Sequence, residues 1–259
     1  MIKISPLFSG SKGNSTLIQS DNVNILLDAG YSYRSLLRAL ESRGLTPKDI
    51  GAIVISHEHT DHIAALPYWT KYYPTPVYAP TLIADYIRQR VYFAEVYDIC
   101  GSFVLGDVSV DTYECSHDAR CCFGYRFSSG NACFACVTDT GCITDGLINF
   151  LAPCSSIMLE SNHDEDMLLK GQYSYTLKKR ILSDFGHLSN RQTAEILGRL
   201  IGKNIKNIIL AHLSENNNTK ELAFSSAVGV YASNGIVEGK DVNVYVADQY
   251  RNEVTICID

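Results

Sequence analysis

The sequence contains no continuous apolar run of about 18 residues, the length that a membrane-spanning helix needs, so we expect no contact with a membrane. The amino-terminal residues, Met1-Ile2-Lys3-Ile4, show no basic region followed by a long apolar stretch, and we expect no secretory signal. Low-complexity tracts are also missing, which excludes fibrous and largely disordered proteins. There is no excess of positive charge: 22 Lys and Arg face 28 Asp and Glu, for a formal charge of −6. This balance argues against a protein that coats nucleic acid through a basic surface, but it leaves room for a local basic groove.

Nine cysteines are present, an odd and scattered set in a chain without an export signal. We therefore expect reduced thiols and a cytoplasmic location. Cys133 and Cys136 have the spacing of a redox or zinc pair, but they lie in an expected strand, where residues three apart point to opposite faces. Cys121 and Cys122 have no second cysteine pair to complete a zinc site. Cys133 and Cys136 are therefore interpreted as structural, and the sequence does not fix the role of the other cysteines.

Short β-branched runs alternate with helical patterns along the chain. The expected strands are Ile2 to Phe8, Ser15 to Gln19, Asn24 to Asp28, Ala52 to Ser56, Val77 to Ala79, Val108 to Tyr113, Gly124 to Ser128, Ala132 to Thr138, Ser156 to Glu160, Asn207 to Ala211, Val242 to Ala247 and Glu253 to Ile258. The expected helices are Ser35 to Arg43, Thr81 to Arg90, Asp145 to Leu151, Arg191 to Leu200 and Lys220 to Tyr231. Two β-rich stretches, each followed by helices, predict two sheets packed face to face with helices outside. No linker divides the chain, so we expect one domain over residues 1–259.

The strongest chemical signal is Ser56-His57-Glu58-His59-Thr60-Asp61-His62, directly after the expected strand Ala52 to Ser56. Three imidazoles and a carboxylate at a strand end supply nitrogen and oxygen donors that suit zinc, manganese or iron. Residues of the same type recur after later strands: His117, Asp139 and His212. A solvated surface loop does not explain this recurrence.

This order, HxHxDH followed by His, Asp and His, resembles the metallo-β-lactamase superfamily over nearly the whole chain. The resemblance implies an α/β fold, a four-layer αββα sandwich of two mixed sheets, with two divalent metal ions at one edge. It implies that one ion is held by His57, His59 and His117, the other by Asp61, His62 and His212, and that Asp139 bridges them. Asp28 matches the family's buried aspartate behind the metal loop; an ordinary turn aspartate is the alternative.

Two positions narrow the class of enzyme that the resemblance implies. Flavodiiron oxidoreductases of this fold have Glu where this chain has His59, and many β-lactamases have Cys where it has Asp139. Both departures favour a hydrolase that does not act on antibiotics. The segment Asp184 to Asn190 resembles the region of RNase Z-type enzymes whose histidine, here His187, protonates the leaving oxygen, and Glu160 resembles the carboxylate that orients it. A structural cap or a substrate hydrogen bond remains the alternative for His187.

Four segments together resemble the YycJ/WalJ family of cytoplasmic bacterial metallohydrolases, which act as 5′-to-3′ exonucleases on double-stranded DNA. They are Ser9 to Thr16, Glu160 to Asp164, Gly186 to Asn190 and Ala211 to Asn217. From these segments we expect substrate contacts from Ser11, Lys12, Asn14, His163, Ser189 and Asn190. The first segment is alternatively a plain hairpin turn, and His163 alternatively makes a loop hydrogen bond.

The chain departs from the family sequence in one segment, and the spacing of two expected metal ligands excludes one related class of nucleases. The family usually has Asp-Pro where this chain has Arg120-Cys121-Cys122-Phe123, which puts the local loop in doubt but leaves His117 unchanged. Only 72 residues separate Asp139 from His212, which excludes an inserted β-CASP domain. Lys170, Lys178, Lys179 and Arg180 fall in this interval and are interpreted either as a basic lip for a phosphate backbone or as solvated helix ends.

The sequence therefore predicts a dinuclear metal-dependent phosphodiesterase in which Asp61 positions a metal-activated hydroxide, His187 acts as the acid and Glu160 orients it. The expected cofactors are two divalent ions, zinc or manganese with iron admissible, and the expected substrate is DNA, digested from the 5′ end. The alternative is a small-molecule metallohydrolase, a thioesterase, lactonase or cyclic phosphodiesterase, on the same site. The sequence does not fix the oligomeric state.

Overall fold

Two seven-stranded sheets organise the computed structural model, which describes residues 1–259. The first sheet runs in the order β14 (Ile256–Ile258), β1 (Ile2–Phe8), β2 (Ser15–Gln19), β3 (Asn24–Leu27), β4 (Ala52–Val54), β5 (Val77–Pro80) and β6 (Val96–Ile99). The second runs in the order β13 (Asn243–Val246), β12 (Asn207–Ala211), β11 (Ser156–Glu160), β10 (Ala132–Val137), β9 (Phe123–Ser129), β8 (Val108–Glu114) and β7 (Phe103–Leu105). The predicted fold class is confirmed.

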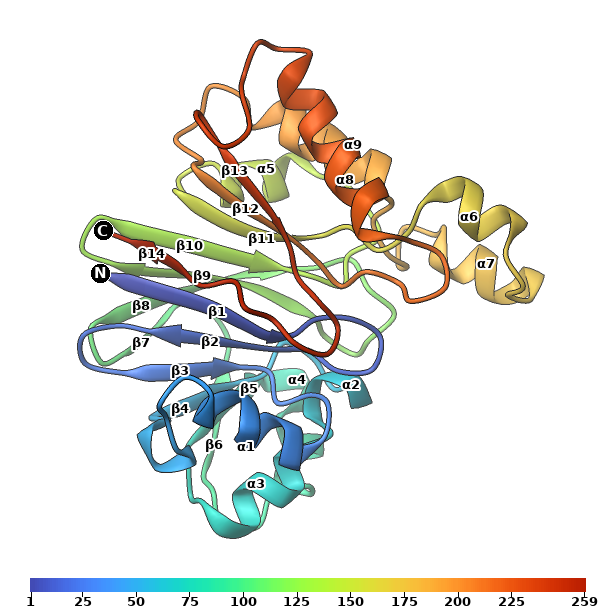
Figure 1. Cartoon of the computed structure of the whole chain (residues 1–259). Helices are drawn as coiled ribbons and strands as arrows, with labels where there is room; N and C mark the ends of the chain where they lie inside the picture. The colour runs from blue at the N-terminus through green and yellow to red at the C-terminus, as the bar shows by residue number, and fades with distance from the viewer.

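The two sheets repeat one pairing pattern. In the first, β14, β1, β2 and β3 pair antiparallel and β3 to β6 pair parallel. In the second, β7 to β10 pair antiparallel and β10 to β13 pair parallel. Neighbouring parallel strands end at the same edge of a sheet, so the loops that follow them gather there. In Figure 1 the ends of β3 and β10 point to the same side of the molecule, the right of the view.

Helices cover the outer face of each sheet. The nine helices of the chain, of which six cover the sheets, are α1 (Tyr33–Glu41), α2 (Thr60–Ile63), α3 (Leu66–Tyr72), α4 (Thr81–Arg88), α5 (Asp145–Leu151), α6 (Glu165–Lys170), α7 (Tyr175–Ile181), α8 (Asn190–Arg199) and α9 (Lys220–Ala232), with one 3₁₀ turn at Pro47–Asp49. Figure 1 shows α1, α3 and α4 beneath the first sheet and α5, α8 and α9 above the second. No helix has both the length and the apolar character that crossing a bilayer requires.

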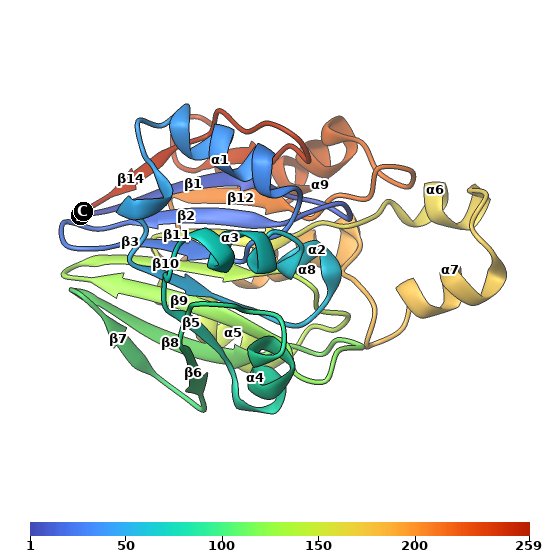
Figure 2. The ribbon, with the colours of Figure 1, turned by 90° about the horizontal axis from the view of Figure 1, so that it is seen from below.

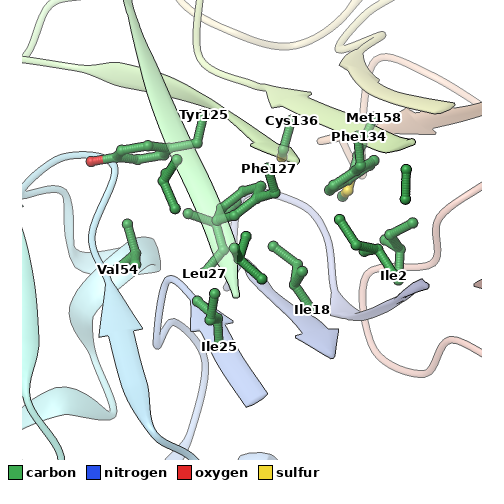
Figure 3. Close-up of a cluster of buried hydrophobic side chains, with 14 of the residues drawn as sticks. Ile2, Ile18, Ile25, Leu27, Val54, Tyr125, Phe127, Phe134, Cys136 and Met158 are labelled. Atoms are coloured by element: carbon green, nitrogen blue, oxygen red, sulfur yellow. The ribbon is translucent and has the colours of Figure 1, made fainter. Parts of the chain in front are cut away.

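Three buried apolar clusters hold the four layers together. The cluster between the sheets contains Ile18, Ile25, Phe127 and Phe134, whose side chains meet in Figure 3. A second cluster packs α5, α8 and α9 on the second sheet, and a third packs α1, α3 and α4 on the first. Burying apolar side chains on both faces of each sheet explains why so many strands have continuous apolar sequences instead of alternating ones.

Most predicted elements occur with ends shifted by one or two residues, but six were not predicted. Strands β6 and β7 are edge strands, and the exposed Tyr97 and Val104 interrupt their apolar patterns. Helices α2 and α6 have four and six residues, too few for a helical period to show. Helices α3 and α7 have seven residues, as does the predicted α5, but α7 buries no side chain that would mark an apolar face. Helix α1 begins at Tyr33, two residues earlier than expected, because the Ser32 side chain accepts a hydrogen bond from the Ser35 N–H.

Helices α6 and α7 form an arm between β11 and α8. Figures 1 and 2 both show this arm projecting from the body on the side where the parallel strands end. Each helix has a side-chain cap: Asp164 accepts from the Met167 N–H and Ser174 accepts from the Leu177 N–H. These caps satisfy backbone donors that the arm would otherwise leave to water.

The cysteines of Cys133-Phe134-Ala135-Cys136 point to opposite faces of β10, as predicted. Cys136 belongs to the cluster between the sheets, whereas Cys133 packs against the cluster under α5, α8 and α9. The partner of Cys133 is Cys154, with 3.4 Å between the two sulfurs. All nine cysteines are free thiols.

Candidate metal centre

The side chains expected to bind metal all follow strands that end at one edge of the sandwich. His57, His59, Asp61 and His62 lie in the loop after β4 and in the first turn of α2. The other three are single residues after strands of the second sheet: His117 after β8, Asp139 after β10 and His212 after β12. The fold thus converts positions far apart in sequence into one cluster.

The donor atoms form two triads that share a carboxylate. The first triad is His57, His59 and His117; the second is Asp61, His62 and His212. Within each triad the ligand atoms lie within 4.8 Å of one another, and Asp139 groups at the same distance with one histidine of each. The structure therefore brings these seven residues together in the grouping that the resemblance implies.

Four residues in the loops at this edge have a left-handed backbone. The φ angles of Asp28, Tyr31, Asp139 and His212 are 59°, 64°, 58° and 56°, a region that residues other than glycine seldom occupy. Such conformations persist only where the surroundings enforce them, and they concentrate at functional sites. Here the Asp28 N–H bonds to the Val54 carbonyl at 2.8 Å and the His212 N–H bonds to Ser9 Oγ at 2.8 Å.

Asp28 is buried behind the metal loop and holds His62 in place. One carboxylate oxygen accepts from the Ser56 N–H at 2.7 Å; the other accepts from Ser56 Oγ at 2.8 Å and from His62 Nδ1 at 2.7 Å. With Nδ1 used in this way, His62 presents Nε2 to the cluster. This arrangement orients a metal-binding imidazole. Ser56 has this role in the structure but was not predicted; its position directly before His57 was the available signal.

Three buried polar atoms in the cluster have no hydrogen-bond partner: His57 Nε2, Asp139 Oδ2 and His212 Nε2. An unsatisfied buried polar atom costs about 1–3 kcal/mol, and three at one point call for a ligand. Burial, together with the neighbouring His62, holds the pKa of His57 well below its ordinary value, so its ring is neutral and can donate a lone pair. Burial alone would raise the pKa of Asp139, but His212 and His62 lower it well below the usual range and keep it ionised. Burial alone would lower the pKa values of His62 and His212, but Asp28 raises that of His62 and Asp139 raises that of His212 well above the usual range. A neutral His57 ring and an ionised Asp139 beside unsatisfied atoms fit divalent metal ions, whose binding would displace the protons on the other two rings.

Glu160, at the end of β11, binds two histidines at once. Its Oε1 accepts from His187 Nδ1 at 2.7 Å and from His212 Nδ1 at 2.9 Å. Its Oε2 accepts from the Thr140 N–H at 3.0 Å. The sequence predicted the first contact but gave no sign of the second, which links the predicted acid to the metal cluster. Although burial alone would raise the pKa of Glu160, its contact with His187 lowers it to about 2.

His187 lies between the triads and solvent. Its ring centroid is 5.1 Å from that of His117 and 5.2 Å from that of His212, and 19% of its side chain is exposed. Burial alone would lower the pKa of His187, but the Glu160 carboxylate raises it above the usual value. The imidazolium form is therefore stabilised at the cluster edge. Because Nδ1 is bound to Glu160, Nε2 is the atom left to contact a substrate.

The loop after β1 and the turn after β3 pack tightly on the metal loop. The Asn14 N–H donates to the Asp61 carbonyl at 2.7 Å, and the Gly30 N–H donates to the Asn14 carbonyl at 2.9 Å. A Cβ on Gly30 would lie 1.7 Å from the Asp61 carbonyl oxygen, so only glycine allows this approach. Asn14 Nδ2 also donates to Asp61 Oδ2 at 3.1 Å.

The six expected substrate contacts divide into two groups. Ser11 and Lys12 are exposed and line a cavity beside Asp61. The other four, Asn14, His163, Ser189 and Asn190, are buried.

Three of these four side chains form hydrogen bonds within the chain. Asn14 contacts the metal loop, Ser189 caps α8 by accepting from the Gln192 N–H, and Asn190 accepts from Ser161 Oγ at 2.6 Å. The His163 backbone pairs with Ser189, but both of its ring nitrogens are buried without a partner. Burial lowers the pKa of His163 to about 4.

Most of the four basic side chains near the arm are bound by the chain itself. Arg180 pairs with Asp118, next to His117. Lys178 donates to the Leu169 and Gly171 carbonyls at 2.7 Å each, and Lys170 pairs with Asp166 at 2.8 Å. These contacts favour the interpretation as structural helix ends over that of a free basic lip.

The unusual segment after His117 also contributes to the cluster. Cys122 is buried, with its sulfur 3.7 Å from His57 Nδ1 and 3.6 Å from the Asp139 carbonyl oxygen. The Arg120 N–H donates to the Glu58 carboxylate at 2.9 Å. This segment therefore contacts the metal loop although its sequence differs from the usual sequence of the family.

The two-sheet sandwich and the His- and Asp-rich edge define a protein of the metallo-β-lactamase superfamily. A sequence profile of that superfamily matches residues 9–99. The crystal structure of the metallo-beta-lactamase fold protein YhfI from Bacillus subtilis superposes with a TM-score of 0.77, at 16% identity and over 98% of both chains.

Two curated proteins are similar along almost their whole lengths. Exodeoxyribonuclease WalJ of Streptococcus pneumoniae serotype 2 (strain D39 / NCTC 7466) is 35% identical over 250 residues, covering 94% of this chain and 93% of the relative. Exodeoxyribonuclease YycJ of Bacillus anthracis is 34% identical over 255 residues, covering 95% and 96%. The chain therefore belongs to the WalJ/YycJ family, and the predicted resemblance is confirmed.

Proposed function

We propose that this chain is a metal-dependent exonuclease that hydrolyses phosphodiester bonds of DNA in the 5′-to-3′ direction. The observation that carries the proposal is the Glu160–His187 pair beside two donor triads, since it supplies a proton donor next to a metal cluster. The exodeoxyribonuclease names of the WalJ and YycJ relatives support DNA as the substrate and an end as the point of attack.

The residues that would hold the metal are the two triads with Asp139 between them. The mixed imidazole and carboxylate donors suit zinc or manganese, and iron is admissible. When bound, two such ions neutralise charge on the phosphoryl oxygens and lower the pKa of a coordinated water. Asp28 fixes the orientation of His62, and Glu160 fixes that of His212, so both rings are held by carboxylates.

Asp61 positions the attacking water in this proposal. Its side chain is 23% exposed, and its Oδ2 lies 3.4 Å from His62 Nε2 and 3.6 Å from His212 Nε2. Asn14 Nδ2 donates to the same oxygen and limits its rotation. The other carboxylate oxygen is free to accept a hydrogen bond from the water and orient it towards phosphorus.

His187 supplies the proton that the leaving oxygen needs. Glu160 favours the imidazolium form, and the proton on Nε2 is transferred to the sugar oxygen as the phosphorus–oxygen bond breaks. The ring then keeps its Nδ1–H bond to Glu160 and is neutral. A thioesterase on these donors has less need for such an acid, because a thiolate leaves without a proton, so the pair favours a bond whose leaving group is an alkoxide, as in a phosphodiester.

The test uses duplex and single-stranded DNA labelled at the 5′ or 3′ end, with purified protein and added Mn²⁺ or Zn²⁺. We expect progressive loss of nucleotides from the 5′ end and at least a hundredfold loss of rate in Asp61→Asn. Asp21→Asn is the matched control, because Asp21 is an exposed aspartate in the β2–β3 turn and no member of either triad. DNA that stays intact with either metal would refute the proposed function.

A further inference from the structure

A cavity of about 840 Å³ opens directly beside Asp61. Its walls come from the loop after β1, the turn and first residues of α1, and the α2–α3 segment. Asp61 lies in its wall, so the cavity is continuous with the metal cluster. This volume is typical of sites for small organic molecules.

Tyrosines dominate the cavity wall. Tyr31, Tyr33, Tyr68 and Tyr72 all line it, and we call this cavity the tyrosine pocket. The Tyr33 ring lies 6.4 Å from the Tyr68 ring and 6.0 Å from the Tyr72 ring, with interplanar angles of 22° and 19°. Tyr68 and Tyr72 are four residues apart on α3, hence on one helix face, and are 61% and 62% exposed. Tyr31 and Tyr33 pack against the apolar cluster beneath the first sheet, whereas Tyr68 and Tyr72 belong to no buried cluster. The exposed rings of Tyr68 and Tyr72 are therefore available to a ligand.

The charged residues on the wall favour an anionic ligand. Lys12 and Arg34 line the pocket, and Asp61 is its only acidic residue. Lys12 is held at the rim by Glu215, at 2.9 Å, and by the Tyr250 hydroxyl, at 2.8 Å. Arg34 is exposed at the start of α1. A guanidinium near open aromatic rings matches a ligand that has both phosphate groups and flat bases.

We propose that the tyrosine pocket binds nucleobases of the DNA strand next to the phosphate that is cleaved, with Arg34 contacting the strand's backbone. The inference rests on the proposed nuclease function and adds the substrate subsite. Stacking on tyrosine does not depend on base identity, so the pocket accepts any sequence. It requires unpaired bases, so it binds an opened strand end and holds the next phosphate at Asp61.

The first test measures binding without chemistry. Fluorescence anisotropy with labelled single-stranded DNA, metal-free protein and a chelator compares wild type with the double variant Tyr68→Ala/Tyr72→Ala. We expect the dissociation constant to rise at least tenfold in the double variant and less than threefold in Tyr68→Phe/Tyr72→Phe, which keeps both rings. Tyr97→Ala is the matched control, because Tyr97 is an exposed tyrosine on β6 that lies outside the pocket; it should bind like wild type.

The second test separates the pocket from the chemistry. With metal added, the alanine double variant should show a tenfold higher KM for DNA and a kcat within threefold of wild type, because the pocket binds the strand but takes no part in the chemical step. If wild type cleaves DNA but the alanine double variant has the same KM and dissociation constant as wild type, the pocket inference is wrong and the nuclease function stands. A wild type that binds DNA through these tyrosines but never cleaves it would support the pocket and refute the nuclease function.

Discussion

At the residue scale, Glu160 connects the two halves of the proposed chemistry. It receives Nδ1–H bonds from both His187 and His212, so one buried carboxylate sets the orientation of the acid and of a metal-binding ring. A neutral amide at this position could not stabilise two imidazole rings equally. Glu160 therefore fixes the position of the proton donor His187 relative to the metal-binding ring of His212.

The role of His187 predicts a dependence on the leaving group. His187→Ala should lower the rate of DNA hydrolysis by roughly 10²–10⁴-fold, the usual contribution of a positioned acid. Hydrolysis of bis-p-nitrophenyl phosphate should fall far less, because its leaving group departs as a stable anion without a proton. Steady-state rates on both substrates test this. An equal loss on the two substrates would show that His187 has a structural role or binds substrate.

His163 predicts a pH dependence of stability. Its folded pKa of about 4 lies below the ordinary value of 6.5, so between these pH values the unfolded chain binds more protons. Stability is therefore lost as the pH falls from about 6.5 to 4, by up to about 3 kcal/mol from this residue. Urea unfolding of wild type and His163→Gln across that range should give a smaller loss in the variant. Parallel curves would contradict the burial of a neutral ring.

The cluster was predictable at this scale, but the contacts that support it were not. HxHxDH is a local pattern, and His117, Asp139 and His212 each end a recognisable strand. The Glu160–His212 bond and the inward position of Asn14 depend on how loops from different sheets meet, which no local pattern contains. The buried Cys122 beside His57 likewise required the packed structure.

At the element scale, strands with continuous apolar sequences were predicted, whereas the edge strands β6 and β7 were not. β11 and β12 are buried along almost their whole lengths, whereas β6 and β7 expose Tyr97 and Val104. Helix α2 contains Asp61 and His62 and has only four residues, and α3 begins three residues after it ends. Their position still matters, since α3 presents two of the tyrosines in the pocket.

The close packing of the β3–α1 turn on the metal loop predicts that Gly30→Ala is severely damaging. The added Cβ would meet the Asp61 carbonyl oxygen, so the loop must move and the second triad with it. We expect loss of bound metal and at least a hundredfold fall in DNA hydrolysis, measured on the purified variant.

Gly229→Ala in α9 is the matched control for Gly30→Ala. A Cβ on Gly229 has open space around it, and glycine in a helix costs up to about 1 kcal/mol relative to alanine. Activity should be unchanged and stability equal or slightly higher. If Gly30→Ala also kept its metal and its activity, the described loop packing would be wrong.

At the scale of the whole molecule, the two sheets share one buried cluster, and we propose that the chain folds as a single domain. Thermal unfolding should then be one transition. Because the metal residues come from both sheets, bound metal should stabilise the whole fold. Removing metal with a chelator should lower the melting temperature by several degrees, and restoring Zn²⁺ or Mn²⁺ should reverse the change. Two separate transitions, or a melting temperature that does not depend on metal, would contradict this.

The net charge of the chain differs in sign from the local charge that we expect at the metal cluster. The formal charge of −6 describes the chain without metal, whereas the phosphate-binding edge would carry two divalent cations. Local charge at the cluster, with the exposed Arg34 at the neighbouring pocket, then favours a polyanion although the whole molecule is acidic.

The central claim, a phosphodiesterase that needs two metal ions, is tested most directly by titrating metal-free protein with Mn²⁺. Bound metal per chain and the rate of digestion of 5′-labelled DNA are measured on the same samples. We predict that the rate rises until two ions are bound per chain, and that His117→Ala and His212→Ala each bind one ion fewer and lose activity. Full activity with one bound ion, or with none, would contradict the account.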